Sequence, residues 1–313
     1  MSSADEEALG LFGGPGGWDC GARLAGFTGP MKAVEIEDAP CRTATAAGHQ
    51  RIKADVSKLD PRPFAGRTQG LKISPPCPPY SISGRGGGKL DRAAVEARID
   101  AFARGEQPAD VEWHDPRSHL TAEPMRWAVA LRPRWIACEQ VPGALPLWRH
   151  IGGHLEQLGY SVVTGVLSAE QYGVPQVRRR AVLIARRDGI AAALPAPTHR
   201  RMYGTEPGLP NAITMHEAIG WGLTDRPAWT VTGGGTRTGG AEVFGNAKCR
   251  AKIGNRRPTV AEAAVLQGFP ADYPFAGDTE GARYQQVGDA IPPQLAAAIL
   301  APLISTTGLE AAA

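Results

Sequence analysis

The sequence predicts an α/β fold in which a doubly wound, mostly parallel sheet is joined to a second, smaller and loop-rich domain. Two observations support this prediction. Short β-prone runs alternate with segments of helical spacing through residue 187, which is the pattern of strands connected by helices. Beyond that point the chain becomes rich in Gly, Pro, Thr and Arg and loses helical periodicity, which indicates a separate unit.

The alternation can be followed along the chain. Residues 8–12 form an apolar run that ends in glycines, so they predict a first strand with a tight turn after it. Residues 22–26 have the pattern of a short helix, and Asp38 can cap a second helix that runs to residue 47. The other strand candidates are residues 32–36, 51–54, 71–74, 135–138, 161–167 and 181–185. Helical spacing marks residues 125–131, 145–158, 259–266 and 295–303.

Composition excludes several classes of protein. The chain has 313 residues, of which 42% are hydrophobic and 21% charged, so a folded core is expected. We see no apolar run of about 18 residues, and the acidic N-terminus lacks the pattern of a signal peptide. The five cysteines are scattered and none forms Cys-x-x-Cys, so neither a disulfide framework nor a zinc site is indicated. We therefore expect a cytoplasmic, monomeric protein with no metal and no membrane contact.

The charge pattern leaves two interpretations open. The net charge is only +3, but arginines cluster at residues 178–180, 186–187, 200–201 and 256–257. Such clusters are often solvated surface, and they also suit a surface that binds phosphate groups.

A glycine-rich turn follows the first strand candidate. Phe12-Gly13-Gly14-Pro15-Gly16-Gly17 lets the backbone approach a ligand, although Asp19 occupies the third glycine position of the dinucleotide fingerprint. Glu35 ends the second strand candidate, where a carboxylate can bind a ribose hydroxyl, and Asp55 follows the third. One acid at each strand end fits a cofactor that contains an adenosyl group.

Cys77 lies in an unusual setting. Two prolines precede it and two follow it, so the thiol is presented on a stiff, non-helical turn at the end of a strand candidate. The flexible, basic loop of residues 81–89 comes next. This arrangement indicates a nucleophile that meets an anionic substrate, while a buried structural cysteine is the simpler alternative.

Two further segments end at the same edge of the predicted sheet. Glu139 ends the strand candidate of residues 135–138, and strand alternation places Gln176, Arg178 and Arg180 on one face. The guanidinium groups could hold a carboxylate and polarise a carbonyl oxygen. A helix cap and a solvated basic edge are the alternatives.

These segments together resemble the DNA (cytosine-5) methyltransferases of bacteria and phages, in the family's order and over nearly the whole chain. The matching motifs are Phe12–Gly17, Glu35, Asp55, Pro75-Pro76-Cys77 with Ser81, Glu139-Gln140-Val141, Gln176-x-Arg178-x-Arg180, Arg257-Pro258-Thr259, Glu262, residues 266–270 and residues 288–293. The resemblance implies a Rossmann-like methyltransferase sheet.

The resemblance also implies a reaction. The Cys77 thiolate would add to C6 of a cytosine flipped out of the duplex, and Glu139 would protonate and bind N3. Arg178 would bind O2, while Arg180 would hold Glu139 or the cysteine loop. Carbon C5 would then take a methyl group from S-adenosyl-L-methionine.

Further roles follow from the same resemblance. Residues 1–187 and 286–313 would form the catalytic domain, and residues 188–285 the target-recognition domain. The cofactor would contact Phe12, Gly14, Gly16, Gly17, Glu35, Ile36, Asp55, Pro76, Asp289 and Ala290. Double-stranded DNA would contact Ser81, Ser83, Arg85 and Arg237. The resemblance also implies the modification enzyme of a restriction-modification system.

Three positions depart from the family pattern. Gln140 replaces Asn and lengthens a side chain that braces the cysteine loop, and Pro78 replaces a common Gln. Asp289 replaces the Asn of the last motif, which places a carboxylate near the cofactor and the thiol. This carboxylate could stabilise a sulfonium, or it could raise the pKa of the Cys77 thiol and slow the enzyme. It could also change which sulfonium donor is accepted.

Two alternatives remain at this point. A tRNA cytosine-5 methyltransferase would share the fold and the chemistry, and the sizeable region after Arg187 favours DNA. A catalytically weak DNA-binding regulator would keep the fold without the reaction, and the presence of Cys77, Glu139, Arg178 and Arg180 argues against it.

Overall fold

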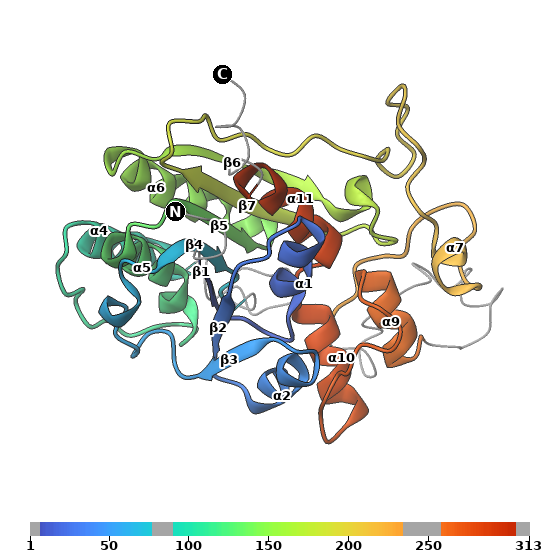
Figure 1. The fold of residues 1–313 in the computed structure, drawn as a ribbon, viewed down its shortest axis with the longest axis horizontal. Helices are drawn as coiled ribbons and strands as arrows, with labels where there is room; N and C mark the ends of the chain where they lie inside the picture. The colour runs from blue at the N-terminus through green and yellow to red at the C-terminus, as the bar shows by residue number, and fades with distance from the viewer. Residues whose placement is uncertain (1–6, 77–89, 234–257, 305–313) are drawn as a thin grey trace.

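The computed structural model describes residues 7–76, 90–233 and 258–304 and contains a seven-stranded sheet of order β3-β2-β1-β4-β5-β7-β6 (Figure 1). The paired strands from β3 to β5 are parallel, and β7 runs antiparallel to both β5 and β6. The predicted fold class is confirmed. The strands are β1 (Glu7–Leu11), β2 (Met31–Glu35), β3 (Gln50–Lys53), β4 (Thr68–Ile73), β5 (Trp135–Gln140), β6 (Ser161–Ser168) and β7 (Arg179–Arg186).

The predicted helices are present, with shifted ends. The helix expected at residues 22–26 begins earlier, at Gly17, because α1 starts directly from the glycine turn. Thr259 caps α9 through its hydroxyl, which accepts from the Glu262 amide, while Glu262 bonds back to the Thr259 amide. The helices are α1 (Gly17–Leu24), α2 (Asp38–Ala46), α4 (Arg92–Ala103), α5 (Glu123–Leu131), α6 (Leu145–Gln157), α7 (Met215–Ile219), α9 (Val260–Gln267), α10 (Glu280–Asp289) and α11 (Pro293–Ile304).

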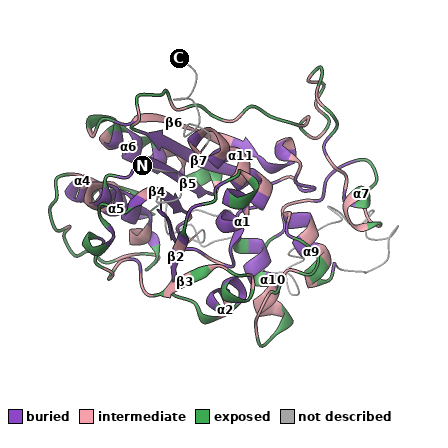
Figure 2. Cartoon of the chain, in the orientation of Figure 1, coloured by how far each residue is buried: buried purple, intermediate pink, exposed green. Residues whose placement is uncertain are grey.

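Helices cover both faces of the sheet. Leu9 and Leu11 of β1 point to a core that α4, α5 and α6 complete, whereas Ala8 points to the opposite core with α1 and α11. Every residue of β5 is buried, which is expected for a strand covered on two sides. Figure 2 shows the strands of the sheet as largely buried, with exposed residues along the outer helices and loops.

A third core lies to one side of the sheet. Met215 and Val231 pack with residues of α9 and α10, among them Leu266 and Val287. Figure 1 shows α7, α9 and α10 grouped together on this side. This core includes Val287 and Ala290, which lie beyond position 285, and the expected domain boundaries stay a prediction.

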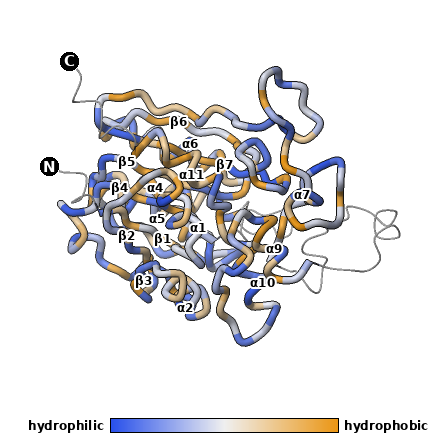
Figure 3. The backbone as a smooth tube through the Cα atoms, turned by 45° about the vertical axis from the view of Figure 1, so that its right-hand side comes forward, coloured by the Kyte–Doolittle hydropathy of each residue, from blue (hydrophilic) through white to orange (hydrophobic). Residues whose placement is uncertain are grey.

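One stretch, Glu280–Ile304, is long and apolar enough to cross a membrane, with a hydropathy of 1.4. It comprises α10 and α11, and 61% of its most apolar window is buried inside the fold. Helix α11 packs against α1, so this stretch has the character of a core helix. Figure 3 shows apolar segments concentrated around the sheet and hydrophilic ones along the outer loops.

Candidate active site

The strand order brings two predicted motifs to the same point. Strands β2 and β3 are added on one side of β1, and β4 and β5 on the other, so the strand order reverses between β1 and β4. Because β1 and β4 are parallel neighbours, the segments after them leave the same edge side by side. The first is the glycine turn, residues 12–17, and the second is Ser74-Pro75-Pro76, which leads into Cys77. The amide of Ser74 still bonds to the carbonyl of Leu11. Ligand sites of open α/β sheets occur at this kind of switch point.

The glycine turn is tightly folded against its neighbours. Phe12 adopts φ 58°, a conformation that is uncommon outside glycine and typical of functional turns. A Cβ at Gly17 would collide with the carbonyl of Ile291, so the start of α1 lies directly against the last motif. Both oxygens of Glu35 accept backbone hydrogen bonds, from Gly14 at 2.8 Å and from Ile36 at 2.7 Å.

A buried charge cluster supports this turn from behind. Asp19 lies 2.8 Å from Lys72 Nζ and 2.8 Å from the Arg51 guanidinium, and all three side chains are almost fully buried. Burial alone would raise the pKa of Asp19, but Lys72 and Arg51 hold it well below its usual range. Arg51 also donates to the carbonyls of Gly13 and Gly14. The cluster therefore fixes the turn through its backbone.

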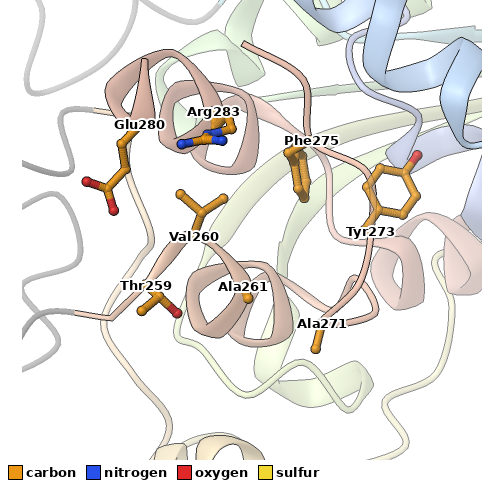
Figure 4. Close-up of a pocket in the computed structure, with 8 residues that line it drawn as sticks. All are labelled: Thr259, Val260, Ala261, Ala271, Tyr273, Phe275, Glu280 and Arg283. Carbon is orange, nitrogen blue, oxygen red and sulfur yellow. The ribbon is translucent and has the colours of Figure 1, made fainter. Parts of the chain in front are cut away.

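A pocket between α9 and the start of α10 lies behind the same turn (Figure 4). Its lining residue Tyr273 points its hydroxyl toward the N-terminal part of the chain, away from Glu280 and Arg283. That hydroxyl donates to the carbonyl of Pro15 at 2.6 Å. Tyr273 thus connects the lining of the pocket to the glycine turn.

The residues at this edge suit an adenosyl cofactor with a positive charge. Ile36 is 59% exposed, although it follows a buried strand, so an apolar surface is available beside the Glu35 carboxylate. Partial burial raises the pKa of Glu37, and the charges of Glu35 and Asp289 raise it further. A bound cation would relieve this mutual repulsion among carboxylates. Asp55 accepts from Ser57, at 2.9 Å from its amide and 2.7 Å from its hydroxyl.

Glu139 lies at the end of β5, next to the cysteine segment. It is 3% exposed, and its Oε1 lies 2.8 Å from Arg180 Nε. Its Oε2 accepts from the Ser74 hydroxyl at 2.8 Å. The Ser74 oxygen itself accepts from Trp18 Nε1 at 2.9 Å. Because the indole can only donate, the Ser74 proton is directed toward Glu139.

Gln140 bridges β5 to the cysteine segment. Its side-chain amide donates to the carbonyl of Pro75 at 2.6 Å, and its Oε1 accepts from the amide of Val141 at 2.6 Å. The residue is fully buried. The longer side chain therefore does brace the segment that leads to Cys77.

Arg178 and Arg180 lie in different surroundings. Arg178 is 1% exposed and donates to the carbonyls of Val231, Gly288 and Ala290 at 2.9 to 3.1 Å. Gln176 reinforces this junction, since its Nε2 donates to the carbonyl of Leu266. The structure thus brings Arg180 into contact with Glu139.

Asp289 is an exposed residue at the end of α10, and its Oδ2 accepts from Gln285 at 2.7 Å. Partial desolvation raises the pKa of its carboxyl, and the Gln285 hydrogen bond opposes this rise. The positive charges of Arg178, Arg180 and Arg117 also lower the pKa of Asp289.

Cys77, Ser81, Ser83, Arg85 and Arg237 lie outside the described residues. Lys72, Arg51 and Ser74 also belong to this site, although the sequence pattern did not indicate them. A lysine within the apolar strand Gly70-Leu71-Lys72-Ile73 was the available signal, because a buried lysine requires a partner.

The strand order, the antiparallel β7 and the glycine turn beside β1 define an α/β methyltransferase fold. The family model of C-5 cytosine-specific DNA methylases matches residues 7–213 and 230–305. The chain belongs to this family, and its activity is S-adenosylmethionine-dependent methylation of cytosine C5 in DNA.

Known proteins similar to the chain agree with this placement. The type II methyltransferase M1.HphI of Haemophilus parahaemolyticus is 29% identical, over 92% of this chain and 84% of its own. The type II methyltransferase M.NaeI of Lentzea aerocolonigenes is 27% identical, over 94% and 73%. The crystal structure of the S. pombe Dnmt2 methyltransferase has a TM-score of 0.70 at 18% identity and covers 97% of this chain and 99% of that one, which supports the fold.

Proposed function

We propose that the chain methylates cytosine in double-stranded DNA through a covalent adduct with Cys77. The observation that supports this most is the pairing of buried Glu139 with Arg180 and Ser74, beside the segment that leads to Cys77. A carboxyl group held from two sides at that point suits recognition of a ring nitrogen on an extruded base.

In the proposed reaction, the Cys77 thiolate forms a bond to C6, and the C5=C6 electron pair makes C5 nucleophilic. Glu139 donates a proton to N3, so the ring does not accumulate negative charge. S-adenosylmethionine would supply the methyl group to C5, and its S–CH3 bond would break to release S-adenosylhomocysteine. A base then removes the C5 proton, the C5=C6 bond re-forms, N3 returns its proton, and the Cys77 thiolate leaves.

We assign different roles to the two arginines. Arg180, in contact with Glu139, is the candidate for the cytosine O2 and for orienting that carboxyl. Arg178 is a positioning residue, because its described bonds join residues 231, 288 and 290. Arg180 thus keeps its expected contact with Glu139, and recognition of O2 moves from Arg178 to Arg180.

The cofactor would be held by the edge of the sheet. Glu35 would bind the ribose and Ile36 would cover the adenine, while Asp55 would accept from its amino group. Phe12, Gly14, Gly16, Gly17, Pro76, Asp289 and Ala290 would complete the site.

DNA would be bound by both parts of the chain. We propose residues 188–285 as the target-recognition domain, with Arg237 reading base edges and Ser81, Ser83 and Arg85 closing over the extruded base. The type II names of the relatives suggest the modification enzyme of a restriction-modification system, acting as a monomer in the cytosol.

Incubation of purified protein with unmethylated duplex DNA and S-adenosylmethionine, followed by mass spectrometry of the nucleosides, tests the proposal. We expect 5-methylcytosine from the wild type and none from Cys77→Ala. A parallel reaction with tRNA should give no product. Methylation of tRNA alone, or undiminished methylation by Cys77→Ala, would contradict the proposal.

A further inference from the structure

A cluster of two histidines and one aspartate bridges α4 and α6, away from the residues assigned to methyl transfer. His150 and His154 lie one turn apart on α6, and each Nε2 is 2.7 Å from the same oxygen, Oδ1 of Asp100 on α4. The two rings are 5.2 Å apart and nearly perpendicular. The three candidate ligand atoms all lie within 4.8 Å of one another.

From this geometry we propose that Asp100, His150 and His154 form a binding site for a divalent transition metal of the zinc type. Imidazole nitrogen and carboxylate oxygen are ligands that Zn²⁺ accepts, and three protein ligands leave a fourth position for water. Mg²⁺ and Ca²⁺ prefer sets made of oxygen alone, so they do not fit. Cysteine spacing predicts no zinc site in this chain, and the proposed site uses no cysteine.

The proton arrangement at the cluster is compatible with metal binding. Without a metal, both Nε2–H groups donate to one carboxylate oxygen. With a metal, each ring carries its proton on Nδ1, and the Nε2 lone pair becomes the ligand. Tetrahedral Zn–N and Zn–O bonds of about 2.1 Å place ligand atoms roughly 3.4 Å apart, so each contact must lengthen by only about 0.7 Å.

The cluster is also accessible. The side chains of Asp100, His150 and His154 are 36%, 33% and 20% exposed, so a metal could enter from solvent without unfolding. Asp100 is anchored on α4, which packs against α6. A surface position of this kind needs only side-chain rotation to adopt metal geometry.

The position of the cluster suggests a structural role. Helix α6 begins shortly after Gln140, at the catalytic edge, and His150 and His154 lie one to three turns further along it. Helix α4 follows the segment that contains Cys77, and buried Asp91 at its start accepts from the amides of His114 and Asp115. A metal would join these two helices without touching the reacting groups.

Binding can be measured with the full chain, purified without a histidine tag and treated with a chelator. Co²⁺ and then Zn²⁺ are added, with visible absorption and calorimetry as readouts. We expect one equivalent to bind the wild type, and His154→Gln and Asp100→Asn to bind at least tenfold more weakly. The control His216→Gln changes an exposed histidine on α7 and should bind like the wild type.

Two further readouts separate this site from the proposed function. Zn²⁺ should raise the melting temperature of the wild type and of His216→Gln, and should not raise that of His154→Gln. DNA methylation should proceed in chelator with the wild type and with His154→Gln alike. Failure of the wild type to bind a stoichiometric metal, or binding by both cluster variants at wild-type affinity, would overturn the proposal.

Discussion

Ser74 connects the start of α1 to the carboxylate of Glu139. Trp18, the second residue of α1, donates to the Ser74 oxygen, and Ser74 donates to Glu139. The positions of Glu139 and Arg180 at strand ends predicted their place in the site. Ser74 was not predictable, because a serine at the end of a strand has no distinguishing pattern. Its role depends on α1, β4 and β5 meeting in space.

Ser74→Ala should lower kcat by about 10- to 100-fold, because a hydrogen bond to a charged group contributes roughly 1.5–3 kcal/mol. The substrate KM should change little, since the hydroxyl contacts Glu139 and Trp18 in the described structure. Steady-state kinetics across pH would measure both effects. Ser161→Ala, which removes a hydroxyl bonded to the amide of residue 192, is the matched control. An unchanged kcat and pH profile would contradict the role given to Ser74.

Asp289→Asn should stabilise the protein near neutral pH. Desolvation raises the pKa of Asp289, so the charged form is disfavoured in the folded state relative to the unfolded one. The resulting loss of stability develops as pH rises from the ordinary range of an aspartate through the raised value. At pH 8, urea unfolding should therefore give a higher free energy of unfolding for Asp289→Asn than for the wild type. This difference should shrink toward pH 4.

Cofactor binding offers a second measurement on the same variant. If the carboxylate contributes to holding a positively charged donor, Asp289→Asn should weaken S-adenosylmethionine binding while stability increases. Nucleoside mass spectrometry should give 5-methylcytosine as the product of both proteins. Tighter cofactor binding by the variant would contradict the assignment of Asp289 to the cofactor site.

At the scale of elements, alternation and turn chemistry predicted the seven strands, because each strand is flanked by glycine, proline or a polar residue. The sequence pattern predicts neither α7 nor α10, and it does not predict α4. Its sequence, Arg92–Ala103, is rich in alanine and charge, so the apolar stripe that faces the core is reduced to Val95, Ile99 and Phe102. The sequence of β7 also gives no local signal of its antiparallel direction, because that direction depends on how the chain connects β6 to β7.

Lys72→Met should destabilise the fold by about 3 kcal/mol, because it leaves Asp19 buried with only one of its two cations. The glycine turn should loosen with it, since Arg51 binds both Asp19 and the turn. Denaturant unfolding and cofactor titration would measure the two effects. Lys58→Met, at an 84% exposed side chain, is the control. Equal stability of the two variants would show that the buried cluster does not support the turn.

At the scale of the whole molecule, the order of motifs predicted the family and the fold, while the junction between the two parts required the structure. Arg178 binds the carbonyls of residues 231, 288 and 290, which belong to segments distant in sequence. A pattern on one strand cannot distinguish an arginine that faces substrate from one that joins two segments. The nucleophile and the residues proposed to contact DNA lie outside the described residues, so their roles remain predictions.

Arg178→Lys and Arg180→Lys should separate these two roles. The first should cost roughly 2–3 kcal/mol of stability, because a single ammonium cannot serve all three carbonyls. The second should leave unfolding nearly unchanged and lower kcat, because Arg180 contacts Glu139. Thermal unfolding and methylation kinetics on both variants would measure this difference. If Arg178→Lys lowered kcat without loss of stability and Arg180→Lys destabilised the fold, Arg178 would be the residue that contacts the substrate.

The covalent step is tested most directly by trapping it. Duplex DNA with 5-fluorocytosine at the methylated position cannot lose its C5 substituent as a proton, so the cysteine cannot leave after methyl transfer. With S-adenosylmethionine, the wild type should form a complex that survives denaturation, and peptide mass spectrometry should locate the linkage at Cys77. Cys77→Ala should form none. A folded, DNA-binding wild-type protein that gives no adduct, or an adduct at another residue, would contradict the proposed mechanism.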